Sequence, residues 1–122
     1  MILSIVNDFC ETPGPRFKSE GNFSGEEFRD EILEPKFLLA KRNNEKLIIK
    51  LDGVYGYPVS FLEEAFGGLI REDHIPYDFL KRHLLIKSDE DDIYIQEINT
   101  YIEIAYKKES EKKIDTWNPH DR

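Results

Sequence analysis

The order of apolar and polar positions predicts strands that alternate with helices. Residues 2–6 are rich in β-branched side chains, and residues 46–51 form a nearly continuous apolar run, so we expect strands at both places. Buried parallel strands show such runs, and we therefore expect the second strand to be central and covered on both faces. A third, shorter strand is expected at residues 84–87.

Apolar side chains at helical spacing predict helices at residues 24–42, 60–70, 75–83 and 91–108. The first two begin with a serine and carry a glutamate three residues later, in the strings SGEE and SFLE. This is the pattern of a capping box, in which the serine oxygen accepts a hydrogen bond from a backbone N–H of the first turn. Pro35 lacks an N–H group, so we expect a kink or a break in the first helix.

This alternation is typical of an α/β domain whose parallel strands are joined by helical crossovers. The length of 122 residues fits one domain. We expect the domain to span residues 1–108 and the polar residues 109–122 to form a disordered C-terminal tail.

Charge and composition exclude several classes of function. The formal net charge is −8, and no dense basic patch is visible, so we do not expect nucleic-acid binding. No apolar run approaches the ~20 residues that cross a bilayer, so we do not expect a membrane protein. The chain has one cysteine, which cannot form an internal disulfide, and we expect a cytoplasmic location.

The chain also lacks the usual motifs of catalysis and cofactor binding. Its three histidines and one cysteine have no metal-ligand spacing, and its glycines do not form a phosphate-binding loop. We therefore expect no metal, no cofactor and no enzymatic activity. An alternative is a small ligand-binding or enzymatic domain in which Asp52, Glu63 and Arg16 share a pocket.

Ser60 is the most informative candidate site, because it follows a strand and a turn and begins a predicted helix. A phosphate there would add about −1.5 to −2 charge at the positive end of the helix dipole. A serine cap is among the commonest helix starts, and taken alone it is far more often purely structural. Both interpretations remain open from the residues alone.

Two strings carry a resemblance to a known family: TPGPRFKSEGNFSGEEFRDE at residues 12–31 and LDGVYGYPVSFLEEAFGGLIR at residues 51–71. They resemble the bacterial STAS-like domain of unknown function, over roughly residues 2–106. The likeness to the STAS domains of anti-sigma-factor antagonists is weaker. The resemblance implies a STAS-like α/β sandwich, with a mixed sheet of about four strands and helices packed mainly on one side.

The resemblance also implies a non-enzymatic regulatory module that binds a protein. In the antagonists, an ATP-dependent anti-sigma kinase phosphorylates a serine at the start of the helix after a central strand, and the phosphorylated form releases that kinase. The equivalent serine here is Ser60. A histidine-kinase-type ATPase or an anti-sigma factor is the expected partner. A further alternative is a structural homodimer subunit that uses the sheet edge near residues 2–6. The expected partner-binding residues are Tyr55, Tyr57, Ser60, Phe61, Glu64 and Arg16.

Overall fold

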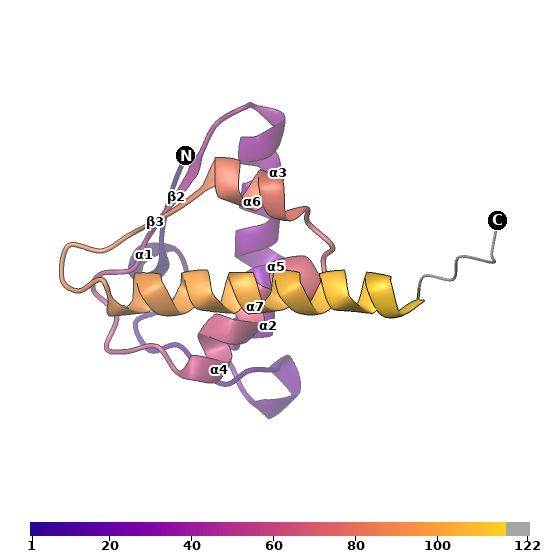
Figure 1. The fold of residues 1–122 in the computed structure, drawn as a ribbon. Coiled ribbons are helices and arrows are strands. Elements are labelled where there is room, and N and C mark those ends of the chain that lie inside the picture. Colours follow the sequence, from indigo (N-terminus) through magenta and orange to yellow (C-terminus); the bar gives the residue numbers. More distant parts are fainter. Residues whose placement is uncertain (117–122) are drawn as a thin grey trace.

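A computed structural model describes residues 1–116 and contains one parallel sheet (Figure 1). Its strands are β1 (Ile2–Ser4), β2 (Leu47–Lys50) and β3 (Leu84–Lys87), in the order β1-β2-β3. Both strand pairs are parallel. The α/β class is therefore confirmed. The mixed sheet of about four strands is not, because the described residues form three strands that all run in one direction.

Helices account for most of the remaining structure. Two π turns join short helices into longer runs: residues 25–42 form the first helical run and residues 59–71 the second. The helical segments are α1 (Ile5–Asp8), a 3-10 turn (Lys18–Glu20), α2 (Gly25–Phe28), a π turn (Arg29–Leu33), α3 (Glu34–Arg42), α4 (Val59–Leu62), a second π turn (Glu63–Gly67), α5 (Gly68–Arg71), α6 (Tyr77–His83) and α7 (Ile93–Thr116).

The sheet is covered on one face. Leu3, Ile49 and Ile86 lie in register on the buried face, and α3 and α6 lie on the same side of the strands in Figure 1. Successive side chains of a strand point to opposite faces. On the other face Ile2 is 57% exposed and Leu85 is 36% exposed. The expectation that the central strand is covered on both faces is therefore wrong, although β2 is the central strand.

The first strand is shorter than predicted because a helical turn begins at its end. Ser4 has an extended backbone and its side-chain oxygen accepts a hydrogen bond from the Asn7 N–H at 3.4 Å. The Ser4 N–H donates to the Asp8 carboxylate at 2.8 Å. These two local hydrogen bonds turn residues 5–8 into α1 instead of continuing the ladder.

The first helical run continues through Pro35 without a break. The π turn Arg29–Leu33 immediately precedes the proline, and the Glu34 N–H donates to the Arg29 carbonyl five residues back. Pro35 then lies in the first turn of α3, where a missing N–H costs little. The wider turn thus accommodates the proline.

The last helix is longer than predicted. We expected it to end at Lys108, yet α7 continues to Thr116. Lysine and glutamate favour helices, which explains why the polar residues after 108 extend the helix. The rest of the predicted tail, residues 117–122, lies outside the described residues.

One apolar core lies between the covered face of the sheet and the helices, and aromatic rings form much of it. Phe28 and Phe61 are fully buried, with ring centroids 5.8 Å apart, and they join the first helical run to the second. The largest fully buried side chains are Phe28, Phe37, Phe61, Phe66, Leu3, Ile5, Leu33, Leu47, Ile49, Leu62, Leu69 and Leu80.

Candidate functional site

Ser60 lies in the first turn of α4 but does not cap it. The helix begins at Val59, and its cap residue is Pro58, which makes no side-chain capping bond. The predicted capping box of Ser60 and Glu63 is therefore wrong, because Ser60 already has helical backbone. Its side chain is partly exposed at the positive end of the second helical run. The predicted cap at Ser24 is confirmed, since its oxygen accepts the Glu27 N–H at 3.0 Å.

The loop before α4 presents one aromatic side chain and buries the other. Tyr55 is 85% exposed, whereas Tyr57 is 7% exposed and its hydroxyl donates to the Leu51 carbonyl at 2.7 Å. Burial raises the pKa of Tyr57 above its usual value. Phe61 is also fully buried. Tyr57 and Phe61 were both predicted to contact a partner, and the structure places them in the core, where they anchor the loop and the helix.

Glu64 is the third predicted contact residue that the structure buries, at 3% exposure. It faces Arg29, which is equally buried and comes from the π turn of the first helical run. Arg29 Nη1 donates to the Glu64 carboxylate and, at 2.6 Å, to the Glu64 carbonyl. Glu64 thus neutralises a buried cation between two helices.

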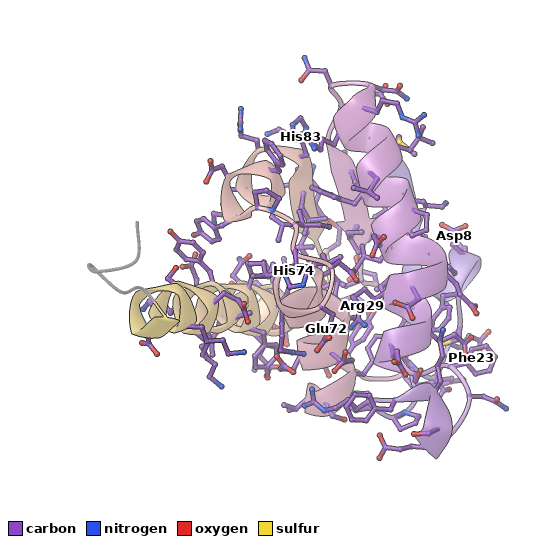
Figure 2. The ribbon with its side chains drawn as sticks, turned by 90° about the vertical axis from the view of Figure 1, so that its right-hand side faces the viewer. Asp8, Phe23, Arg29, Glu72, His74 and His83 are labelled. Atoms are coloured by element: carbon purple, nitrogen blue, oxygen red, sulfur yellow. The ribbon has the colours of Figure 1, made fainter. Side chains whose placement is uncertain are left out.

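Arg29 lies in the middle of the molecule, close to the loop that carries Glu72 and His74 (Figure 2). Its guanidinium passes directly over the second helical run at Gly68. A Cβ atom added at Gly68 would lie 2.1 Å from Arg29 Nη1, far inside van der Waals contact. The helix backbone at Gly68 therefore lies against an arginine side chain, in space that a Cβ atom would otherwise fill.

Arg16 joins this charged cluster from the loop before α2. Its guanidinium donates to Glu63 and, at 3.5 Å, to Glu64. Arg71 binds Glu63 from the other side, at 2.7 and 3.2 Å. Burial opposes ionisation of Glu63, but the hydrogen bonds from Arg71 and Arg16 lower its pKa below the usual value. Arg16 is thus held on the second helical run.

Asp73 closes the cluster on the far side of Arg29. Its Oδ2 atom lies 3.3 Å from Arg29 Nε, yet neither of these buried atoms has a hydrogen-bond partner. Burial and a hydrogen bond with Glu34 raise the pKa of Asp73 to about 7, although Arg29 acts in the opposite direction. The neutral form of the Asp73 carboxyl is therefore favoured at this position, although a buried cation lies beside it.

The structure does not bring Asp52, Glu63 and Arg16 together. The Asp52 carboxylate accepts hydrogen bonds from the Ser88 hydroxyl and from the N–H groups of Asp89, at 2.7 Å, and Glu90, at 3.3 Å. It ties the end of β2 to the loop before α7, while Glu63 and Arg16 bind each other. The expected shared pocket of these three side chains is therefore wrong.

Within residues 1–116, no three histidine, cysteine or carboxylate side chains gather closely enough to hold a metal ion. None of the helices described for this chain has the length and apolar character needed to cross a bilayer.

Sequence reasoning missed Arg29, Arg71 and Asp73. Arg29 follows Phe28 and precedes Leu33 by four residues, so helical spacing places it on the same side as core positions. A buried cation there requires a buried carboxylate on a neighbouring helix, and the string SFLEE carries two glutamates. The sequence therefore held both partners of the ion pair, but nothing in it showed that these two helices face each other.

Comparison with known proteins supports one assignment. A family model described as a STAS-like domain of unknown function matches residues 24–94, which is more than half of the chain. No curated protein and no solved structure shows a significant match. The matched span includes both helical runs, β2, β3 and every residue of the charged cluster described above except Arg16. The chain therefore belongs to the family of STAS-like domains of unknown function.

Proposed function

We propose that this protein is a non-enzymatic regulatory module that binds a protein partner and is switched by phosphorylation of Ser60. The surface around Ser60 carries the proposal. Tyr55 is 85% exposed, Val59 is 59% exposed, and Ser60 lies directly beside Val59 at the start of the second helical run. An exposed tyrosine and an aliphatic residue beside a modifiable hydroxyl are suited to a protein interface.

The position of Arg16 supports a response to phosphorylation. Ser60 lies three and four residues before Glu63 and Glu64, the two carboxylates that hold Arg16. Side chains at this spacing share one face of a helix and lean toward its N-terminus. A phosphate on Ser60 would compete with the two glutamates for Arg16, because arginine binds phosphate strongly. The modification would thus change both the charge and the shape of this surface.

The partner that we propose is a cytoplasmic ATPase of the histidine-kinase type or an anti-sigma factor. This choice follows from the resemblance to anti-sigma-factor antagonists. An enzymatic role based on Asp52, Glu63 and Arg16 has less support, since Asp52 is occupied by the loop before α7.

The test compares binding and phosphorylation in Ser60 variants. Wild type, Ser60→Ala, Ser60→Asp and the control Ser19→Asp, at another exposed serine, are immobilised and incubated with a candidate histidine-kinase-type ATPase. We expect the Ser60→Ala and control variants to bind like wild type and Ser60→Asp to lose binding. With labelled ATP, wild type and the control variant should incorporate phosphate, and both Ser60 variants should not. Equal binding by all four proteins would remove Ser60 from the mechanism.

A further inference from the structure

We propose that the uncovered face of the sheet binds an acidic amphipathic helix of a partner protein. Ile2, Ile48 and Leu85 are aligned across the strands by their register and point to this face. Ile2 and Leu85 are 57% and 36% exposed, and Ile48 between them is partly exposed. We call this row, with the lysines described next, the outer sheet surface. Parallel sheets are usually covered by helices on both faces, so this surface lacks its usual cover.

Lysines next to the apolar row give the surface a positive charge. Lys50 and Lys87 are aligned in the following row, and both are exposed. Lys46 is exposed two residues before Ile48, and strand alternation directs it to the same face. None of the three forms an ion pair within residues 1–116, whereas Arg16, Arg29 and Arg71 all do. Unpaired lysines around an apolar row are complementary to a helix that has apolar and acidic faces.

The size of the surface favours one helix. Neighbouring strands lie about 4.8 Å apart, so three strands span about 10 Å between the outermost backbones. A helix with its side chains is about 10–12 Å wide, and its apolar residues recur every three to four positions. One short amphipathic helix therefore matches the row in width.

Charge argues against two other occupants of this surface, a membrane and a second copy of the chain. An anionic membrane is extended, so the net charge of −8 of the whole chain opposes its approach. A short acidic helix is small enough to interact mainly with the nearby lysines, because salt screens the more distant charges. In a symmetric dimer through this face, the same lysine-rich patch would meet its own copy, which is electrostatically unfavourable.

The test uses designed peptides and the intact protein. A fluorescent helical peptide with leucine on one face and glutamate on the other is titrated against the wild-type protein. The control is a basic peptide of the same sequence in which lysine replaces each glutamate. We expect the acidic peptide to bind and its affinity to fall as salt is added. Its binding should also shift the methyl NMR signals of Ile2, Ile48 and Leu85. The double variant Lys50→Glu/Lys87→Glu should bind about tenfold more weakly. The control Lys107→Glu/Lys108→Glu, which makes the same charge change on α7, should bind like wild type.

Several results would overturn the proposal. The first is equal affinity for the acidic and the basic peptide, or no binding of either one. The second is a set of methyl shifts away from the three strands. A third is binding to phosphatidylserine vesicles that the Lys50→Glu/Lys87→Glu variant abolishes, which would assign the surface to membranes. A last one is a wild-type dimer, measured by light scattering, that this double variant converts to monomer.

Discussion

Arg29 is the residue on which the charged interior depends. Its side chain is almost fully buried, and a buried cation without partners is very unfavourable. Glu64 supplies a carboxylate and a carbonyl, Asp73 lies 3.3 Å away, and Gly68 leaves the space that the guanidinium fills. These residues come from separate segments, so their contacts fix how the helices meet.

Alanine variants of Glu64 and Glu63 test whether the buried Arg29 depends on the carboxylate of Glu64. Glu64→Ala would leave Arg29 buried without its main carboxylate, and we expect a loss of about 3–5 kcal/mol in the free energy of unfolding. Glu63→Ala removes ion pairs that are more exposed to solvent and should cost about 1 kcal/mol or less. Urea denaturation measures both. Equal losses would show that the burial of Glu64 adds nothing.

Asp52 has the corresponding role at the scale of elements. The carboxylate connects the end of β2 with the loop that leads from β3 into α7. Hydrogen bonds from the Asp89 N–H and the Ser88 hydroxyl lower the pKa of Asp52, so its stabilising contribution is present at neutral pH and is lost as the pH falls through that value. It therefore fixes the start of the longest helix relative to the sheet.

Hydrogen exchange can detect the loss of this connection. In Asp52→Ala, the amides of Asp89 and Glu90 lose their acceptor, and we expect them to exchange about tenfold faster. The neighbouring variant Asp89→Ala removes a side chain but keeps the hydrogen bond from the residue 89 N–H to Asp52. Its amide exchange rates should therefore remain near those of wild type. Unchanged protection in Asp52→Ala would mean that the loop is held by other contacts.

Most elements could be predicted from the sequence, because their signals are local. The apolar run of β2 and the serine cap at Ser24 both appear in the structure. The cap of α4 was predicted at Ser60, two residues after the observed cap Pro58, because a proline cap has no side-chain signature like that of a serine. The charged cluster could not be located, because it depends on which faces of two distant helices meet at Arg29.

At the scale of the whole molecule, Asp73 makes stability depend on pH. Its pKa is raised to about 7 in the folded protein, from an ordinary value near 3.8. Between these values the folded state holds a proton that the unfolded state has released. Stability from this group is therefore fully present below the lower value and is lost as the pH rises toward the upper one.

The variant Asp73→Asn separates this contribution from the others. Asparagine stays neutral, so the variant should gain stability relative to wild type as the pH rises from about 5 to about 7, by roughly 1 kcal/mol for each pH unit. Asp78→Asn, at an exposed aspartate without such neighbours, should show no such trend. Thermal unfolding across this pH range measures the difference. A stability difference between Asp73→Asn and wild type that stays constant across this pH range would contradict a raised pKa of Asp73.

The ion pair between the π turns also has a consequence for how the molecule unfolds. If either helical run detached alone, the Arg29 charge or the Glu64 charge would remain in an apolar interior without its partner. Intermediates with one run melted are therefore high in free energy. Residues 25–42 and 59–71 should consequently melt as one cooperative unit, with coincident transitions in every spectroscopic probe.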